Sequence, residues 1–465
     1  MSRVIAISNR VSPPREPGET AQGGLAPAVA AALRDSDGIW FGWSGETTEH
    51  FSGALKRERI GGVTVATVDL EQQDYEEYYE GYANKTLWPL FHYRIDLTAY
   101  DRSFDLGYVR VNSRFAETLA QLIEPDDIIW VHDYHLFPLA QALRRRGVTN
   151  KIGLFLHIPW PSRQILTTLP RHRDLVHSLF DYDLIGFQEL SWLSAFRGYV
   201  QYELQGEIGE ESVRAFNKTL RVGVYPIGID TENFLKAGGS PAADESFVRM
   251  RESLAGRKMI VGVDRLDYSK GLEERFVGFE QFLADNPNYL ERVVMLQIAS
   301  LSRETLEAYQ DLRERLDAAS GRINGAYATF DWAPLRYVNT AYRRDELAGI
   351  YRAAHAALIT PLRDGMNLVA KEYVAAQDPE DPGVLILSRF TGAAAQLKEA
   401  LIINPFSREE IAEALSRALT MPREERIARW RALMDNVEQY DVLRWADDFI
   451  GALRDIAATN GREQA

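Results

Sequence analysis

The sequence of 465 residues contains no cysteine. This absence excludes disulfide bonds, thiolate metal ligands and cysteine nucleophiles, and it suits a compartment where disulfides do not stabilise proteins. Long apolar runs are lacking as well, because no stretch approaches the ~20 residues that a membrane-spanning helix needs. Residues 1–8 also lack the basic and apolar regions of a secretory signal. We therefore expect a cytosolic protein that has no membrane partner.

Basic residues are fewer than acidic residues. The chain has 53 Lys and Arg and 67 Asp and Glu, which gives a formal net charge of -14. Nucleic acids and anionic membranes need a broad positive field, so neither is expected to be the main partner. The chain is 46% hydrophobic and has no low-complexity tract, which is typical of compact globular proteins. At roughly 150 residues per domain, its length predicts two or three domains.

Strand-like apolar runs alternate with helical patterns along the chain, which is typical of βαβ units and parallel sheets. The first series of predicted strands covers residues 4–8, 38–44, 127–133, 152–158 and 221–227. The second series covers residues 259–264, 293–299, 356–360, 383–388 and 400–405. We therefore predict an α/β fold with two doubly wound sheets, whose ligands bind beyond the carboxyl ends of the strands.

The division between the two sheets falls near Gly228, after the last strand of the first series. We expect residues 1–228 to form one domain and residues 229–439 to form the other. An amphipathic pattern over roughly residues 424–457 predicts a long final helix. Its last part, about residues 440–465, is expected to cross back and join the first domain.

The most informative loop, residues 363–367, follows a predicted strand and precedes a helix that begins near Leu368. The free N–H groups at a helix N-terminus suit a phosphate or diphosphate, and Gly365 allows the backbone to approach a ligand closely. Glu372, one turn into the helix, could bind two ribose hydroxyls. A purely structural interpretation makes Asp364 or Asn367 a helix cap and places Glu372, with its neighbour Lys371, on a solvated face.

A companion loop, residues 264–271, follows the strand predicted at residues 259–264. Arg265 and Lys270 in this loop could both reach a diphosphate. Two fixed cations would stabilise the charge that develops on a leaving diphosphate. In other enzymes a divalent metal ion has this role. We therefore expect no metal, and the acidic pair Asp264 and Asp267 is interpreted as capping or ion pairing with the adjacent Arg.

The first predicted strand ends at Asn9-Arg10, and Gly23-Gly24 precede the next helix. This spacing is not a GxGxxG fingerprint, which argues against a dinucleotide site and hydride transfer. Instead, the loop is expected to cover a sugar. Asp133 and His157 follow two other strands and could bind or deprotonate sugar hydroxyls. The neighbouring His132 and His135 are interpreted as structural residues.

Five aromatic residues could form a wall against the apolar faces of sugar rings, although core packing explains several of them as well. They are Trp40, Trp43, Tyr78, Tyr79 and Trp88.

Ten motifs occur in one order between about residues 4 and 445. They are SNR, GGL, IWFGWSG, EEYYEGYANKTLWPLFHY, HDYHL, HIPWPS, DRLDYSKG, SLSR, RDGMNLVAKEY and LSRFTGAA. Together they give the chain a resemblance to the trehalose-6-phosphate synthases.

The resemblance implies the GT-B architecture of two Rossmann-like domains, an N-terminal acceptor domain and a C-terminal nucleotide-sugar domain. It also implies transfer of glucose from UDP-glucose to glucose 6-phosphate, with retention at the anomeric carbon and without a cofactor. The departing phosphate oxygen is expected to assist the acceptor hydroxyl on one face of the sugar, so that no pair of catalytic carboxylates is needed. Members of this family often assemble, so a homo-oligomer (dimer or tetramer) is possible.

The resemblance also implies roles for individual residues. Positions expected to bind the donor are Gly23, Gly24, Arg265, Lys270, Tyr342, Gly365, Met366, Asn367, Leu368, Val369 and Glu372. Positions expected to bind the acceptor are Arg10, Tyr79, Trp88, Asp133 and Arg303, the two arginines gripping its phosphate. Positions expected to act in catalysis are His157, Asp133, Asp364, Arg265 and Lys270.

Two alternatives stay open at this stage. One is the same fold with another acceptor, such as glycerol 3-phosphate, or another donor, such as ADP- or GDP-glucose. The other is a non-catalytic sensor of sugar phosphates, which should have lost some charged residue of the set, whereas this chain retains all of them.

Overall fold

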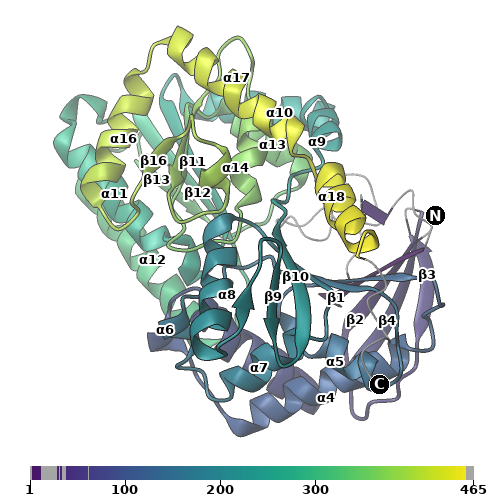
Figure 1. Cartoon of the computed structure of the whole chain (residues 1–465). Helices are drawn as coiled ribbons and strands as arrows, with labels where there is room; N and C mark the ends of the chain where they lie inside the picture. The colour runs from purple at the N-terminus through teal and green to yellow at the C-terminus, as the bar shows by residue number, and fades with distance from the viewer. Residues whose placement is uncertain (1–2, 12–28, 31, 34–37, 61, 457–465) are drawn as a thin grey trace. The chain divides into compact units, whose positions relative to one another are not determined.

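The computed structural model describes residues 3–11, 29–30, 32–33, 38–60 and 62–456 (Figure 1). The chain divides into two compact units. Among the described residues, the second unit is Gly228–Val442, and the first unit contains everything before Gly228 together with the residues from Leu443 onward.

Among its described residues, the first unit is built on a ten-stranded sheet with the order β3-β4-β2-β1-β5-β6-β7-β10-β9-β8. Its strands are β1 (Val4–Arg10), β2 (Ile39–Thr48), β3 (Lys56–Ile60), β4 (Val63–Glu71), β5 (Ile128–His132), β6 (Ile152–Phe155), β7 (Leu184–Phe187), β8 (Glu207–Ile208), β9 (Ser212–Ala215) and β10 (Lys218–Val224). The central pairings from β4 to β10 are parallel, and antiparallel strands lie at both edges. The almost fully buried apolar strands β1, β5, β6 and β7 form its core.

Helices cover this sheet on both faces, with α4, α5 and α7 drawn below the strands and α18 above them in Figure 1. The helices of the first unit are α2 (Gln72–Asp74), η1 (Tyr75–Leu87), α3 (Trp88–Phe91), η2 (Ile95–Leu97), α4 (Arg102–Leu119), η3 (Tyr134–Leu136), α5 (Leu139–Arg144), α6 (Arg163–Leu166), α7 (His172–Leu179), α8 (Leu190–Glu203) and α18 (Val442–Arg454). The segment η1 is a π-helix, a form that is rare and often found at functional sites.

The second unit has six strands, all paired in parallel, in the order β13-β12-β11-β14-β15-β16. They are β11 (Lys258–Arg265), β12 (Val293–Ser300), β13 (Leu335–Val338), β14 (Ala356–Ile359), β15 (Val384–Ser388) and β16 (Leu401–Ile403). Counted along the chain, this order is 3-2-1-4-5-6, which is the doubly wound order of nucleotide-binding sheets.

Helices lie on both sides of this second sheet as well (Figure 1). They are α9 (Thr231–Gly238), α10 (Pro241–Leu254), η4 (Tyr268–Lys270), α11 (Leu272–Asp285), η5 (Pro287–Tyr289), α12 (Glu307–Tyr327), α13 (Arg344–Ala353), α14 (Leu368–Ala375), α15 (Ala393–Gln396), α16 (Arg408–Thr420) and α17 (Arg423–Gln439).

In both sheets, the order of the strands reverses next to the first strand. The reversal lies between β1 and β5 in the first unit and between β11 and β14 in the second. Loops that leave neighbouring strands on opposite sides at such a point diverge and leave a crevice, where open α/β sheets bind their ligands. The topology therefore singles out the loops after β1, β5, β11 and β14.

The long final helix predicted from the sequence is wrong in one respect, because two helices, α17 and α18, occupy that segment. The backbone N–H of Val442 donates to the carbonyl of Ile229 at 3.0 Å instead of continuing a helical ladder. Gly228 makes this crossing possible, since a Cβ there would lie 2.0 Å from the carbonyl oxygen of Tyr440.

Helix α18 packs on the first sheet through aromatic side chains. The ring of Phe449, which is fully buried, lies 5.8 Å from Trp130 and 5.7 Å from Phe155. Gly153 and Gly186 leave room for it, since a Cβ at either position would approach the Phe449 ring within 2.9 Å. The C-terminal helix is therefore part of the core of the first unit.

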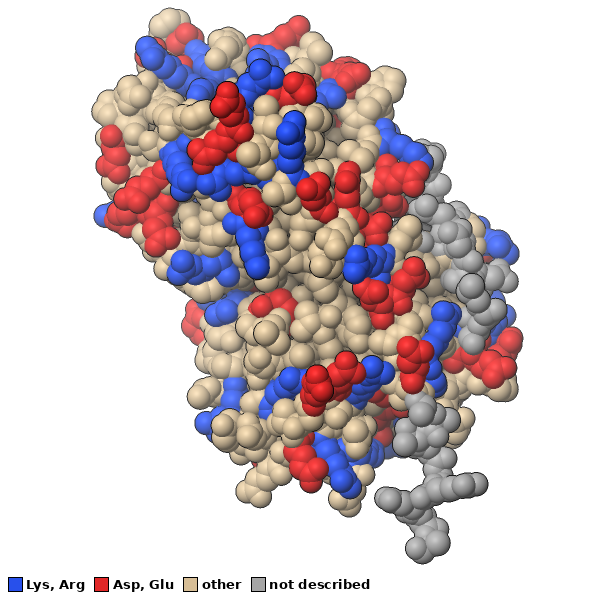
Figure 2. All heavy atoms as spheres, turned by 45° about the horizontal axis from the view of Figure 1, so that its top comes forward, with Lys and Arg blue, Asp and Glu red and all other residues tan. Residues whose placement is uncertain are grey.

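On the face drawn in Figure 2, acidic and basic side chains are interspersed over the described surface. Ion pairs between surface side chains include Arg315 with Glu273 and Arg322 with Glu280. Among the described helices, none is long and apolar enough to cross a membrane.

Replacing Phe449 by Ala is expected to destabilise the first unit by about 3–5 kcal/mol, because it removes a buried aromatic ring and leaves a cavity. The matched control is Leu443→Ala on the same helix, where the side chain is 49% exposed and a change of less than about 0.5 kcal/mol is expected. Urea unfolding followed by tryptophan fluorescence measures both. Equal unfolding midpoints for the two variants would contradict the packing described for α18.

Candidate functional site

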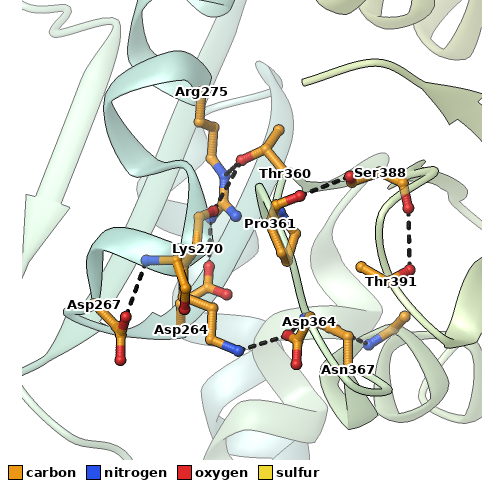
Figure 3. Close-up of polar contacts among 12 residues, drawn as sticks. Asp264, Asp267, Lys270, Arg275, Thr360, Pro361, Asp364, Asn367, Ser388 and Thr391 are labelled. Carbon is orange, nitrogen blue, oxygen red and sulfur yellow. Dashed lines mark hydrogen bonds and ion pairs between the residues drawn. The ribbon is translucent and has the colours of Figure 1, made fainter. Parts of the chain in front are cut away.

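Two loops of the second unit meet through an ion pair at the point where the strand order reverses. Lys270 follows β11 and Asp364 follows β14, and the Lys270 Nζ lies 2.6 Å from Asp364 Oδ2 (Figure 3). The two side chains are 13% and 14% exposed, so the pair is shielded from most of the solvent but can still be reached. A lysine held in this way is a fixed positive charge at the carboxyl edge of the sheet.

The two loops interlock tightly around this pair. The Leu362 N–H donates to the carbonyl of Ser269 at 2.8 Å, and the Thr360 hydroxyl donates to the carbonyl of Gly271 at 2.8 Å. Gly271 has a φ of 62°, and a Cβ there would lie 2.1 Å from the Thr360 carbonyl oxygen, so the position requires glycine. The position of Lys270 is therefore fixed by the backbone of its own loop and of the next.

A third loop, after β15, supports the segment that carries Asp364. The Asp364 N–H donates to the carbonyl of Phe390 at 3.0 Å, and the Ala393 N–H donates to the carbonyl of Met366 at 2.9 Å. A Cβ on Gly392 would lie 2.0 Å from the Gly365 carbonyl oxygen. The motif LSRFTGAA therefore acts as a backbone support for RDGMN.

Asn367 caps helix α14 and also steadies Asp364. Its Oδ1 accepts from the Ala370 N–H at 3.1 Å, while its Nδ2 donates to Asp364 Oδ2 at 3.2 Å. The capping role considered from the sequence is thus correct for Asn367. Because Asn367 is the N-cap, the free N–H groups of the first turn of α14 begin beside Asp364.

Lys371 and Glu372 do not lie on a solvated face, contrary to the structural interpretation of the sequence. Lys371 is fully buried, and its Nζ donates to Gln396 Oε1 at 2.7 Å. Burial lowers the pKa of Lys371 to about 7. Glu372 is half-buried, and burial raises the pKa of its carboxyl above the ordinary value against the opposing effect of Arg344. Both residues therefore belong to the interior around the helix N-terminus.

Arg303 is held within the second unit by a buried acid and a buried tyrosine. Its Nη1 donates to Tyr309 Oη at 2.5 Å and lies 3.3 Å from Asp267 Oδ2. Tyr309 Oη in turn donates to Asp267 Oδ2 at 3.1 Å. Asp267 thus forms an ion pair with Arg303, which lies in another loop than the adjacent arginine of the prediction.

Asp264 lies beneath the loops and contacts Arg275. Arg275 Nη1 donates to Asp264 Oδ2 at 2.6 Å and to Gln297 Oε1 at 2.7 Å, and its Nε donates to Thr360 Oγ1 at 2.9 Å. All four side chains are buried. This buried cluster lies beneath the loops at the carboxyl edge of the sheet.

The remaining predicted donor residues of the second unit lie in different places. Arg265 is the half-buried last residue of β11. Gly365, Met366, Leu368 and Val369 flank Asn367 at the start of α14. Tyr342 lies half-buried in the loop before α13, and the described contacts do not connect it to Lys270 or Asp364. Gly23 and Gly24 fall outside the described residues.

In the first unit, Asp133 and His157 come together at the ends of β5 and β6. The Asp133 N–H donates to the carbonyl of Phe155 at 2.8 Å, and Asp133 Oδ1 accepts from the His157 N–H at 3.1 Å. His132 Nδ1 lies 3.2 Å from His157 Nε2, so one of the two rings donates to the other. The sequence does not predict this contact of His132 with His157. The one signal for it is that His132 directly precedes Asp133.

Both histidines are buried in an aromatic environment. The ring of Trp445 from α18 lies 5.9 Å from His157 and 6.1 Å from His132. Burial lowers the pKa of His157 to about 3, and burial together with His157 lowers the pKa of His132 well below its ordinary value. Both imidazoles are therefore neutral at pH 7 and can donate or accept hydrogen bonds without carrying charge.

Arg10 and Tyr79, two predicted acceptor residues, meet around Trp43. The Arg10 guanidinium lies 5.7 Å from the centre of the Trp43 ring, and that ring lies 5.5 Å from Tyr79. Tyr79 also stacks on His135 at 6.2 Å. A Cβ on Gly45 would lie 2.7 Å from Arg10 Nη2, so this glycine leaves space for the guanidinium.

Core packing accounts for most of the proposed aromatic wall. Trp40, Trp43, Tyr78 and Trp88 are all buried, whereas Tyr79 is half-buried. Trp88 contacts the ring of Tyr134 at 5.8 Å, next to Asp133.

Three of the predicted site residues adopt a backbone conformation that non-glycine residues rarely use. The φ angles are 74° at Asp133, 50° at Arg303 and 83° at Asn367. Such strain costs on the order of 1–3 kcal/mol at each residue and persists where the surrounding structure requires it, commonly at functional sites.

Two other features bear on the choice of site. Within the described ranges, no group of three or more His, Asp or Glu side chains is arranged to hold a metal ion. A cavity of about 870 Å³ in the second unit is lined at the amino ends of β14 and β15, by residues such as His355 and Gly383, and includes none of the predicted site residues.

The fold and the site define an α/β protein of the doubly wound, nucleotide-binding class. Residues 8–455 match the model of glycosyltransferase family 20. The trehalose-6-phosphate synthase of Sinorhizobium fredii is 46% identical over 465 residues, covering 99% of this chain and 100% of the relative. The chain therefore belongs to glycosyltransferase family 20, and it is a glycosyltransferase.

Solved structures agree with this assignment. The UDP-forming alpha,alpha-trehalose-phosphate synthase from Burkholderia xenovorans, in complex with glucose-6-phosphate, is 48% identical with a TM-score of 0.94, covering 97% of this chain and 100% of that chain. An E. coli protein bound with UDP-2-fluoro glucose is 45% identical with a TM-score of 0.93, covering 98% and 100%. The predicted α/β, GT-B fold class is confirmed by these similarities.

Acid is expected to destabilise the protein through the two buried histidines. An unfolded histidine has a pKa of about 6.5, whereas the pKa of His157 is about 3 in the folded chain. Between these values the unfolded chain binds more protons, so the free energy of unfolding falls as the pH falls, by up to about 1.4 kcal/mol per pH unit for each such histidine.

The His157→Gln variant lacks one of these histidines. Its free energy of unfolding should therefore fall less steeply than that of the wild type as the pH is lowered from 6 to 4.5. His50→Gln, at an exposed position, is the matched control and should leave the slope unchanged. Urea unfolding at a series of pH values measures the slopes, and a slope for His157→Gln equal to that of the wild type would show that His157 is not buried in its neutral form.

Proposed function

We propose that the chain transfers glucose from UDP-glucose to the anomeric hydroxyl of glucose 6-phosphate, with retention, and releases UDP and α,α-trehalose 6-phosphate. Two relatives matched over their full length, a trehalose-6-phosphate synthase and a UDP-forming alpha,alpha-trehalose-phosphate synthase, support this reaction. The observation that carries the proposal is the Lys270–Asp364 pair, which lies beside the N-terminus of α14 where the strand order of the second unit reverses.

We assign the nucleotide sugar to the second unit, as the nucleotide-sugar domain. Lys270 and Arg265 would neutralise the diphosphate, Lys270 exchanging Asp364 for phosphate oxygens. The N–H groups at the start of α14 add a favourable local field, and Glu372 would accept from the ribose hydroxyls. Asp364, released from Lys270, would then accept from a hydroxyl of the transferred glucose.

We assign the acceptor chiefly to the first unit, as the acceptor domain, with Arg10, Tyr79, Trp88 and Asp133 as its contacts. Arg303 of the second unit would contribute a second guanidinium to the 6-phosphate. Paired guanidinium groups suit a phosphate because several N–H groups donate to its oxygens at once.

His157 is assigned a hydrogen bond to the transferred sugar. Its low pKa excludes a protonated imidazole as the general acid at neutral pH, and leaves the neutral ring to orient a hydroxyl. A separate general acid is therefore unnecessary in this proposal, because Arg265 and Lys270 stabilise the charge that develops on the diphosphate. The acceptor hydroxyl passes its proton to that diphosphate oxygen on the same face of the sugar.

The two cations also make a divalent metal unnecessary in this proposal. A cytosolic location and assembly into a homo-oligomer stay predictions from the sequence.

A coupled assay of nucleoside diphosphate release tests the reaction. Release of UDP from UDP-glucose is expected with glucose 6-phosphate and not with glycerol 3-phosphate or without acceptor, and NMR of the product should show an α,α-1,1 linkage. Release with another acceptor, or from ADP- or GDP-glucose alone, would overturn the proposed acceptor or donor. The absence of release with every pair, despite binding of the ligands, would indicate a sugar-phosphate sensor.

A further inference from the structure

Arg303 is held in a small network of side chains with Asp267 and Tyr309. Its backbone is strained, with a φ of 50°, and its side chain is only 11% exposed. Both of the contacts described above, to Tyr309 and to Asp267, fall on the same nitrogen, Nη1. Two buried groups thus hold this nitrogen of the guanidinium in place.

Asp267 and Tyr309 are themselves firmly placed. They are 1% and 2% exposed, and Tyr309 lies in the first turn of α12 with its ring 5.2 Å from that of Tyr268. The Arg303 guanidinium also lies 5.7 Å from the centre of the Tyr309 ring. A flexible arginine is thereby attached to two residues that are packed in the core.

The two oxygens of Asp267 serve different loops. Oδ2 accepts from Arg303 and Tyr309, whereas Oδ1 accepts from the Ser269 N–H at 2.9 Å, one residue before Lys270. The Asp267 carbonyl also accepts from the Lys270 N–H at 3.0 Å, as Figure 3 shows. One buried carboxylate thus connects the loop that carries Lys270 with the loop that carries Arg303.

We propose that Asp267 and Tyr309 are positioning residues that hold Arg303 ready for the phosphate of the acceptor. This inference rests on the function proposed above. Without them, the arginine side chain samples more rotamers, and binding the phosphate must then restrict it further at an entropic cost. The carboxylate also connects the acceptor arginine to the donor loop, so that its complete removal affects both substrates.

The Tyr309→Phe variant tests the positioning role. It removes one hydroxyl that contacts a charged group and keeps the packed ring, so we expect the KM for glucose 6-phosphate to rise roughly 10-fold, while kcat and the KM for UDP-glucose stay within about threefold. The matched control is Tyr289→Phe, a half-buried tyrosine of the same unit, for which all three constants are expected to be unchanged.

A double-mutant cycle distinguishes action through Arg303 from a general loss of structure. In an Arg303→Ala background, Tyr309→Phe should change the KM for glucose 6-phosphate, or its dissociation constant by calorimetry, by less than about twofold. Asp267→Ala, which also releases the Ser269 N–H, should raise the KM for both substrates.

Additive effects of Tyr309→Phe and Arg303→Ala, or a Tyr309→Phe variant with an unchanged KM for glucose 6-phosphate, would overturn the positioning role while the proposed function stands. A change in both KM values for Tyr309→Phe would equally overturn it, because it would show a general structural effect. A wild-type protein that neither turns over nor binds glucose 6-phosphate would overturn the proposed function and this inference together.

Discussion

The parallel pairing of β11 with β14 is the constraint on which the candidate donor site depends. Ile260 pairs with Ala356 and Val261 with Ala357, so these two strands end at the same edge of the sheet. Their loops leave that edge at the point where the strand order reverses, and so Lys270 and Asp364, 94 residues apart in sequence, form an ion pair. Three loops then interlock through backbone hydrogen bonds. They pass so close to one another at Gly271 and Gly392 that a side chain at either position would clash with the backbone.

This arrangement explains how the chain keeps a cation in a partly buried place before a ligand arrives. A lysine removed from water without a partner would lose its proton or destabilise the fold. Asp364 supplies the compensating charge, and Asn367 holds Asp364 in turn. A diphosphate offers more negative charge than one carboxylate, so exchange of partners is favourable and leaves Asp364 available for the sugar.

Much of the fold could be predicted because buried parallel strands are continuous apolar runs. The predicted strands at residues 4–8, 127–133 and 293–299 correspond to β1, β5 and β12. The strand β3 was missed because its sequence, KRERI, is charged and exposed at the edge of the sheet, whereas β7 was missed although its four residues are all buried. The break between α17 and α18 depends on a contact with Ile229 more than 200 residues away, which local periodicity does not encode.

The candidate site could be predicted as a set of loops, but its supporting contacts could not. Lys371 belongs to the motif RDGMNLVAKEY, in which a lysine is expected to be exposed. Its burial depends on the packing of the folded chain, where its Nζ donates to Gln396. The pairing of Asp267 with Arg303 joins two loops that are adjacent only because β11 and β12 are neighbours. The roles assigned to single residues stay predictions, since they concern ligands and not the fold.

A crystal structure of the chain with UDP-glucose, or with an inert analogue of it, tests the central claim most directly. The account predicts that Lys270 Nζ lies within about 3 Å of a diphosphate oxygen, having left Asp364, with the diphosphate at the N-terminus of α14. A bound nucleotide sugar whose diphosphate lies elsewhere, with the Lys270–Asp364 pair intact, would contradict it.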